Sequence, residues 1–420
     1  MTSGAKKRRA GPADSKKRLK EARSDDSMDG RGYNAGPGGN IPRDPLTLAI
    51  AAHERAIALR EATRLPEAER ACRSALRDYT RAEGAAHPDV ANALVELGQI
   101  LEGRDQLRPA RACQARALAI LTRLGRTSDP DVLRLRVRAR VFVAGIDRAL
   151  GAYAAADRGF AAALREAKRA FGPRDADVAG IFNNLGVLRK YQGRYAEAAR
   201  FYGRALPLLR AAGDRGALAT LYHNLGGIEH ARGRHAAGEP HARKSVALRE
   251  AELGRGHVVV AADVAALAAI VEGRGRLAEA ARLYLRAIAV FRRKLGEQSA
   301  EVALNLASLA SLREQQDRRP EAERLFTRAI ALQERVFGRG HPEVALTLNN
   351  LAFLERRAGR RARALRLYER ALRVFQHKLG PRHPHTRLAA ANLRGTRLEV
   401  AREARALKRR PPNRPMKGRA

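Results

Sequence analysis

Polar side chains that can bind a peptide recur immediately before a leucine in this sequence. Asn183-Asn184, His223-Asn224 and Asn349-Asn350 are the three pairs of this kind. A primary amide offers both a hydrogen-bond donor and an acceptor, so a row of asparagines can pair with the backbone of an extended peptide whatever its side chains are. The pattern therefore indicates binding of a polypeptide segment.

Basic residues follow the same leucines five positions later and extend this expected surface. Lys190 and Arg356 are the two examples, and their charges favour acidic side chains in the bound peptide. An alternative is that individual asparagines stay in water or bond to their own backbone. The predicted groove residues are Asn183, Asn184, Lys190, His223, Asn224, Ser308, Asn349, Asn350 and Arg356.

Residue types for other chemistry do not form a site. His223, His230 and His235 are close in sequence, but a metal site would need a fourth ligand and carboxylate support that the sequence does not offer nearby. The glycine-rich stretch 36–39 precedes no strand and matches no phosphate-binding loop. We therefore predict no catalytic residues, no metal and no cofactor.

The helices that must position the amides are clearest in residues 341–380. This stretch predicts two amphipathic helices, here called helix A and helix B, joined by a tight turn at Gly359. Helix B carries an alanine, an aromatic residue four positions later and a second alanine three positions after that, as Ala364, Tyr368 and Ala371. Small residues at these positions let two helices cross closely, and the ring fills the gap beside them.

The same arrangement recurs eight times. The first small residue of helix B is Ala68, Ala110, Ala156, Ala198, Gly238, Ala280, Ala322 or Ala364. The aromatic slot holds Cys72, Gln114, Phe160, Tyr202, Ala242, Tyr284, Phe326 or Tyr368. Leu225, Leu267, Leu309 and Leu351 of helix A succeed one another at intervals of 42 residues. The spacing of the two alanines and the aromatic residue resembles that of the tetratricopeptide repeat, which has about 34 residues. Because the present unit is eight residues longer, each helix is expected to be one turn longer.

Two intervals along helix A differ from this period. The step from Leu97 to Val143 is 46 residues, and four extra residues are about one helical turn, so we expect a longer helix A in that copy. The step from Leu185 to Leu225 is 40 residues, and the linker 213–216 between them is correspondingly short.

Three short motifs of the last copy resemble the kinesin light chain type of tetratricopeptide repeat. They are His341-Pro342-Glu343-Val344-Ala345, Leu348-Asn349-Asn350-Leu351-Ala352 and Lys378-Leu379-Gly380. The resemblance covers about residues 46–400. It implies an all-α, right-handed superhelical solenoid of about eight helix hairpins with a C-terminal capping helix. In that group similar asparagines and basic residues hold acidic linear motifs. The resemblance thus implies a non-catalytic scaffold or adaptor.

Composition divides the chain into four segments. Residues 1–44 form a predicted disordered, basic, Gly- and Pro-rich tail, 45–382 the repeat solenoid, 383–408 the capping helix, and 409–420 a second basic tail. Basic clusters at 6–9 and 16–20 resemble a nuclear import signal. The absence of an apolar leader and of a membrane-spanning stretch favours the cytoplasm, with the nucleus as the alternative in a eukaryote. Cys72 and Cys113 are expected to be free thiols.

The formal net charge of +38 supports a second functional hypothesis. Residues 45–400 alone carry +26, and such a surface attracts nucleic acid or another polyanion. The charge is mostly arginine spread through every copy, and few aromatic residues are available for base stacking. We therefore expect a protein partner that presents a linear, acidic motif, with polyanion binding as the alternative. No feature of the sequence indicates an oligomeric state.

Overall fold

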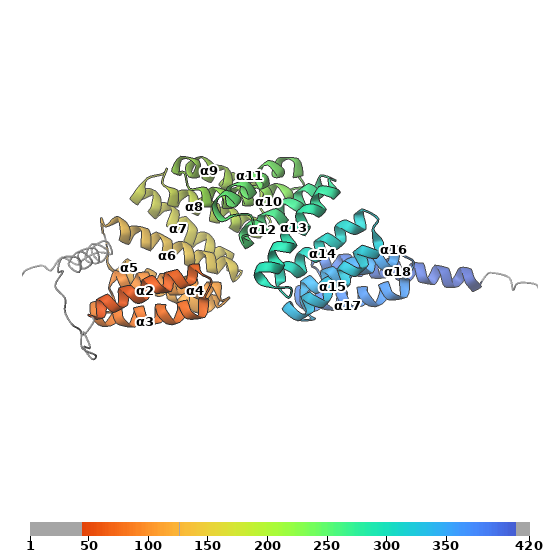
Figure 1. Cartoon of the computed structure of the whole chain (residues 1–420), viewed down its shortest axis with the longest axis horizontal. Coiled ribbons are helices and arrows are strands. Elements are labelled where there is room, and N and C mark those ends of the chain that lie inside the picture. Colours follow the sequence, from red (N-terminus) through yellow and green to blue (C-terminus); the bar gives the residue numbers. More distant parts are fainter. Residues whose placement is uncertain (1–43, 126, 409–420) are drawn as a thin grey trace, which may run out of the picture. The chain divides into compact units, whose positions relative to one another are not determined.

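The computed structural model describes residues 44–125 and 127–408, and the regular structure in these ranges is helical throughout (Figure 1). The 17 helices of these ranges form eight consecutive hairpins and a final helix. This arrangement confirms the predicted all-α fold. The basic tails, with the clusters between Lys6 and Lys20, lie outside the described residues. The predicted domain boundaries and the right-handed superhelical course stay predictions.

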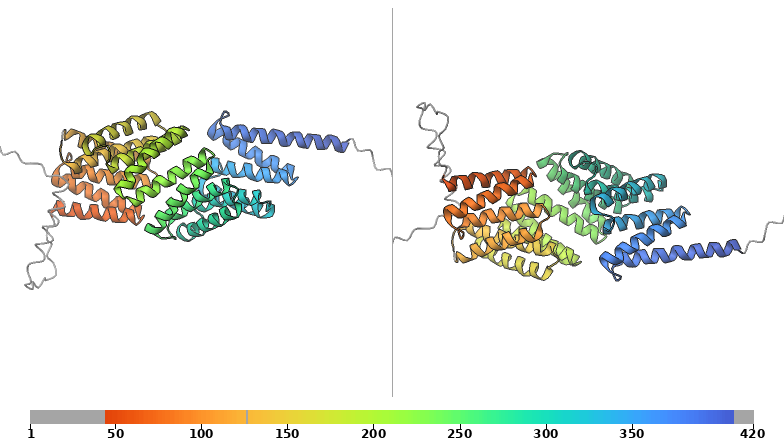
Figure 2. Two further views of the ribbon diagram at one scale, coloured as in Figure 1. Left: turned by 90° about the horizontal axis from the view of Figure 1, so that it is seen from above. Right: turned by 90° about the horizontal axis from the view of Figure 1, so that it is seen from below.

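Two compact units divide the chain, the first ending at Asp214 and the second beginning at Arg215. The first unit contains α2 (Pro45–Glu61), α3 (Leu65–Glu83), α4 (Pro88–Gly103), α5 (Leu107–Arg123), α6 (Pro130–Ala149), α7 (Tyr153–Phe171), α8 (Ala176–Tyr191) and α9 (Tyr195–Ala212). The second contains α10 (Arg215–Ala231), α11 (His235–Leu253), α12 (Val258–Gly273), α13 (Leu277–Leu295), α14 (Ala300–Gln315), α15 (Arg319–Phe337), α16 (Pro342–Arg357), α17 (Arg361–Leu379) and α18 (Pro384–Lys408). Even-numbered helices are helix A of each hairpin. Within each unit, helices that follow one another pack side by side (Figure 2).

The core of each hairpin is built from the predicted small and aromatic residues. Helix B has two positions for a small residue, and every alanine at these positions is fully buried, as Ala198 and Ala205 are. The rings of Phe160, Tyr202 and Tyr368 in the aromatic slot are fully buried as well. Gly186 of α8 faces the ring of Tyr202 so closely that a Cβ atom there would lie 2.6 Å from Tyr202 Cδ1. The repeat pattern therefore specifies how near the two helices of a hairpin approach.

Turns inside the hairpins place one residue in the left-handed backbone region. Gly359 takes this conformation with φ of 77°, as the sequence predicts. Thr63, Asp105 and Asp317 adopt it at the equivalent position of other hairpins, with φ of 62°, 60° and 58°. Any residue with a Cβ is sterically disfavoured in this region, and a β-branched residue such as threonine is disfavoured more than most.

The recurring linker histidines cap helix A. His341 Nδ1 accepts a hydrogen bond from the backbone N–H of Glu343 at 3.2 Å, and His87 and His257 accept equivalent bonds at the starts of α4 and α12. Asp129 and Asp175 do the same for α6 and α8 through a carboxylate. These side chains satisfy N–H groups that have no partner inside the helix. Their recurrence is thus a structural feature of the repeat.

The two irregular intervals between helix A leucines are accommodated as predicted, by a longer helix and by a short linker. Helix α6 has 20 residues, whereas α8 has 16, so one added turn accounts for the 46-residue step. Helix α9 ends at Ala212, and α10 begins at Arg215 after a two-residue linker. Within residues 44–125 and 127–408, no helix combines the length and the apolar content that crossing a membrane requires.

Candidate functional site

Three of the predicted groove residues lie on α8, in the first unit. The side chains of Asn183 and Asn184 are half-buried, and that of Lys190 is exposed. Asn184 Nδ2 donates a hydrogen bond to the carbonyl oxygen of Gly180 at 3.1 Å, one turn earlier in the same helix. Its amide nitrogen is therefore partly satisfied, as the local-bonding alternative predicts. Tyr191, which the sequence analysis missed, is 60% exposed beside Lys190.

His223 and Asn224 lie on α10, and His223 is held by a buried carboxylate. Its Nδ1 atom lies 2.7 Å from Oδ1 of Asp263 on α12. Ser245 Oγ donates to Asp263 Oδ2 at 2.7 Å, and Arg249 Nε lies 2.7 Å from the same oxygen. Burial by itself would raise the pKa of Asp263. The hydrogen bonds from His223 and Ser245, with the charge of Arg249, outweigh burial and leave that pKa below its ordinary value.

This network fixes the position of His223 and does not form a catalytic triad. Ser245 and His223 both bond to Asp263, so the histidine is not placed to take a proton from the serine hydroxyl. The signal that the sequence analysis missed is the single acidic residue in an otherwise apolar run, VVVAADVAALAAIV, where a buried carboxylate requires partners.

The remaining predicted residues lie on α14 and α16 of the second unit. Ser308 Oγ donates to the carbonyl oxygen of Leu304 at 3.3 Å. Asn349 is buried, and its Oδ1 accepts a hydrogen bond at 3.2 Å from Asn392 Nδ2 of α18. Arg356 Nε lies 3.4 Å from Glu399 Oε1, also on α18. The side chains of Asn349 and Arg356 therefore join helix A of the last hairpin to the final helix.

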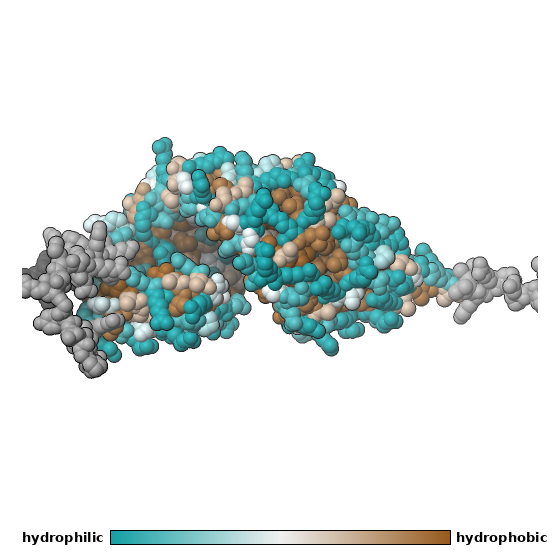
Figure 3. Space-filling view, in the orientation of Figure 1, coloured by the Kyte–Doolittle hydropathy of each residue, from teal (hydrophilic) through white to brown (hydrophobic). Residues whose placement is uncertain are grey.

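Asn350 differs from its neighbour, because its half-buried side chain has no hydrogen-bond partner among the described residues. Phe353 lies one turn further along α16 and is 39% exposed, and Leu304 on α14 is 36% exposed. The guanidinium of Arg357 lies 5.9 Å from the Phe353 ring centroid and pairs with Glu314 on α14. Figure 3 shows apolar surface mixed with hydrophilic surface around α14. We call Leu304, Ser308, Asn350, Phe353 and Arg357 the α14–α16 surface.

Two further histidines lie side by side in the α10–α11 hairpin. The Nδ1 atoms of His230 and His235 are 3.1 Å apart. His223 instead pairs with Asp263, so the three histidines that are close in sequence do not converge. In the part of the chain that the structure describes, no group of three His, Cys, Asp or Glu side chains is placed to hold a metal ion.

Arginines throughout the chain pair with carboxylates of neighbouring hairpins. Arg60 Nε lies 2.5 Å from Glu96 Oε1, Arg111 Nε lies 2.6 Å from Asp147 Oδ1, and Arg243 Nη2 lies 2.6 Å from Glu279 Oε1. Each of these pairs spans 36 residues of sequence. Much of the basic charge is thus paired across consecutive repeats and connects them.

The densest of these clusters surrounds Glu239 of α11. This buried carboxylate accepts hydrogen bonds from Arg243, Arg274 and Arg276. Burial would raise the pKa of Glu239, but the three guanidinium groups outweigh it and lower that pKa to about 2.

A family comparison agrees with this architecture. The tetratricopeptide repeat model matches residues 47–123, 136–211, 217–293, 258–335, 298–377 and 343–409. The chain belongs to the tetratricopeptide repeat family. The resemblance to tetratricopeptide repeats that the repeat pattern indicated is thus confirmed. Domains of this family typically mediate binding to proteins and peptides.

Solved structures with TM-scores above 0.5 show the same fold at low sequence identity. The apo form of the quorum sensor NprR from B. thuringiensis is 14% identical with a TM-score of 0.60, and the match covers 86% of this chain and 93% of that one. A second match is the STAND protein PH0952 from Pyrococcus horikoshii, which has a tetratricopeptide repeat sensor. It is 12% identical with a TM-score of 0.55, and the match covers 79% of this chain and 50% of that one. Kinesin light chain TPR-like repeats from Podosopora anserina are 18% identical with a TM-score of 0.41, over 47% of this chain and 94% of theirs. A comparison with curated proteins finds no match.

Proposed function

We propose that this protein is a non-catalytic scaffold that binds a linear segment of a partner protein along the exposed face of helix A. The observation that carries the proposal is Asn350, a half-buried amide without a partner among the described residues, next to the exposed ring of Phe353. The amide atoms of Asn350 are not buried from solvent, so they are free to exchange water for the hydrogen bonds of a ligand. An extended peptide on the α14–α16 surface would bond to Asn350 through its backbone and cover Phe353 and Leu304 with an apolar side chain.

The first unit carries a related set of residues on α8. Lys190 is exposed beside Tyr191, and the side-chain oxygen of Asn184 accepts no hydrogen bond from the other described residues. The preference for an acidic motif rests on Lys190, because Arg356 and Arg357 already pair with Glu399 and Glu314. We therefore propose two separate contact sites: α8 in the first unit for acidic residues, and the α14–α16 surface in the second unit for apolar residues. His223, whose Nδ1 atom is held by Asp263, presents its Nε2 atom at a fixed position on α10.

We further propose that the protein acts in the cytoplasm. The thiols of Cys72 and Cys113 are free, and burial raises the pKa of each, to about 12 for Cys72. The reducing cytoplasm keeps such thiols unpaired.

The rival function, binding of nucleic acid through the basic surface, is less well supported by the side-chain arrangement. Arginine side chains are paired with carboxylates in consecutive hairpins, as Arg111 is with Asp147. Tyr202, Tyr284 and Tyr368 are buried in the aromatic slots, where a base cannot stack on them.

A peptide-display experiment tests the proposal. A random peptide library is selected against the full chain, and enriched peptides are measured by fluorescence anisotropy at about 0.15 M salt. We expect Asn350→Ala with Phe353→Ala to weaken binding at least about tenfold, since both a hydrogen bond and an apolar contact are lost. The matched control, Gln298→Ala with Leu295→Ala, removes an exposed amide from the α13–α14 linker and an exposed apolar side chain from the end of α13, and it should leave affinity unchanged.

Two results would contradict the proposal. One is equal weakening by both double variants. The other is a library that yields no binder while the protein retains nucleic acid until nuclease is added, which would move the functional site to the basic surface.

A further inference from the structure

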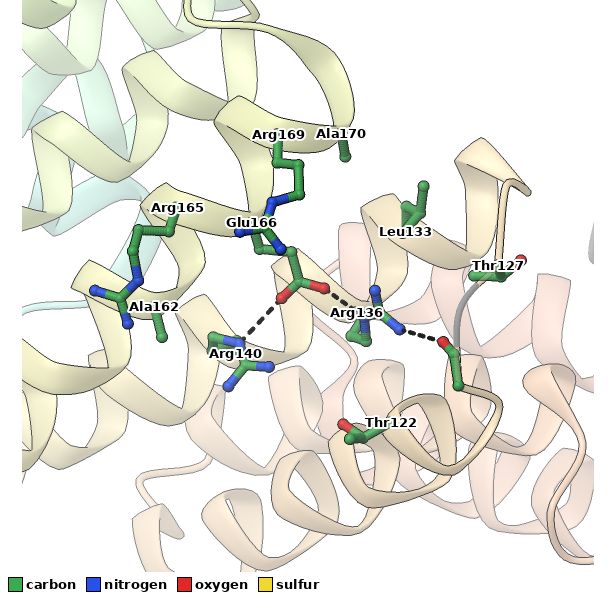
Figure 4. Close-up of a pocket in the computed structure, with 11 residues that line it drawn as sticks. Thr122, Thr127, Leu133, Arg136, Arg140, Ala162, Arg165, Glu166, Arg169 and Ala170 are labelled. Carbon is green, nitrogen blue, oxygen red and sulfur yellow. Dashed lines mark hydrogen bonds and ion pairs between the residues drawn. The ribbon is translucent and has the colours of Figure 1, made fainter.

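A cavity of about 720 Å³ lies in the first unit, where the end of α5 meets α6 and α7 (Figure 4). Four arginines line it, together with the carboxylate of Glu166. Arg136 and Arg140 stand one turn apart on α6, and Arg165 and Arg169 stand one turn apart on α7. Two facing helices thus each contribute a pair of guanidinium groups to one cavity.

Glu166 neutralises only part of this charge. Its carboxylate forms ion pairs with Arg136 and with Arg140, the latter at 3.2 Å between Oε2 and Nε. Arg136 Nη1 also donates to the carbonyl oxygen of Gly125 at 3.2 Å. Figure 4 shows the side chain of Arg169 extending from α7 toward Glu166.

Arg165 and Arg169 are exposed at the mouth of the cavity, and they have no hydrogen-bond or ion-pair partner among the residues that the structure describes. Figure 4 shows Arg165 at the edge of the group, beside Ala162. Among the described residues that line the cavity, four positive charges and one negative charge leave a formal excess of three.

This excess contrasts with the arginines elsewhere in the chain. Around Glu239 the arginines share two carboxylates, those of Glu239 and Glu279, and the cluster is nearly balanced. In the cavity, like charges one turn apart on a helix repel each other. A bound anion would remove this repulsion and supply acceptors for the unpaired guanidinium groups.

We propose that this cavity binds a small oligophosphate anion. Guanidinium groups bond to phosphate oxygens in a bidentate manner, and several arginines converging on one cavity suit a ligand with several adjacent negative charges. The volume is within the usual range for small-molecule sites. The described residues that line the cavity include no aromatic side chain, so recognition rests on the phosphates and does not require a base. The site lies on α6 and α7 and is independent of the proposed peptide-binding residues.

Isothermal titration calorimetry of the full chain with inorganic tripolyphosphate, at about 0.15 M salt, tests this site. We expect Arg165→Gln with Arg169→Gln to weaken binding at least about tenfold. The matched control, Arg77→Gln with Arg200→Gln, removes the same charge from exposed positions of α3 and α9 and should change the affinity less than about twofold.

Glu166→Gln should increase the affinity for tripolyphosphate, a result that loss of folding cannot produce. The substitution keeps the shape of the side chain and releases Arg136 and Arg140 from their ion pairs. We expect tripolyphosphate to bind several-fold more tightly to this variant, because its net charge near the ligand is more positive by one. Binding to Glu166→Gln that is unchanged or weaker would overturn the proposal. So would equal weakening of the control and the cavity variant, which would show only general attraction to a basic surface.

Discussion

The aromatic slot of helix B allows one substitution to be tested with opposite expected signs in two repeats. Tyr202 and Tyr284 occupy the same position and are both buried. The hydroxyl of Tyr202 is buried and has no hydrogen-bond partner among the described residues. The hydroxyl of Tyr284 donates to Glu272 Oε2 at 3.1 Å. Tyr→Phe therefore removes an unsatisfied group in one repeat and a satisfied one in the other.

The magnitudes follow from these two environments. A buried polar group without a partner costs about 1–3 kcal/mol, so Tyr202→Phe should raise the free energy of unfolding by about 1 kcal/mol. A hydrogen bond to a carboxylate contributes about 1.5–3 kcal/mol, so Tyr284→Phe should lower that free energy by about 1–2 kcal/mol. Phe160 and Phe326 occupy the same slot in other repeats and are buried, which shows that a phenyl ring fits it.

Urea denaturation monitored by circular dichroism measures both variants, and hydrogen exchange of α9 and α13 shows whether each effect is local to its repeat. Repeat arrays unfold in segments, so the local measurement carries more weight than a single midpoint. The reasoning would be refuted if Tyr202→Phe proved destabilising, or if the two variants shifted stability in the same direction.

Three further predictions concern helix packing, charge and backbone conformation. Gly186→Ala should lower stability by about 1–3 kcal/mol in urea denaturation, since its Cβ would overlap the Tyr202 ring, whereas Gly180→Ala in the same helix meets no atom within 4 Å and should be neutral or stabilising. Because the pKa of Glu239 is about 2 in the folded protein and near 4.5 in the unfolded chain, its contribution is complete above about pH 4.5 and is lost as pH falls toward 2. Glu239→Gln should thus reduce stability at neutral pH and flatten the acid limb of a pH titration of unfolding, and equal slopes in variant and wild type would contradict this. Thr63→Gly should raise the thermal midpoint, because a β-branched residue with φ of 62° is strained there; an unchanged or lower midpoint would show that the flexibility of glycine in the unfolded chain outweighs that strain.

The fold was predictable from the sequence because the contacts of a repeat array are close along the chain. Ala364, Tyr368 and Ala371 lie in one helix and pack against the helix A that immediately precedes them, so their spacing alone reports the crossing. The longer α6 could be predicted for the same reason, since one added turn keeps the apolar face of a helix in register. The role of the linker histidines as N-caps, by contrast, required the geometry of His341 Nδ1.

Which amides are available to a partner was decided only by the tertiary structure. Asn349 and Asn350 are adjacent in sequence and have the same chemistry, but Asn349 bonds to Asn392, 43 residues away, and Asn350 does not. The fixed position of His223 likewise depends on Asp263, forty residues further along the chain. A sequence pattern defines which face of a helix is apolar, whereas the pairing of its polar residues depends on the side chains that the next hairpin presents. The unbalanced arginines of the cavity were hidden for the same reason, because in a chain with 82 basic and 44 acidic residues only distances in space show which charges are left without a partner.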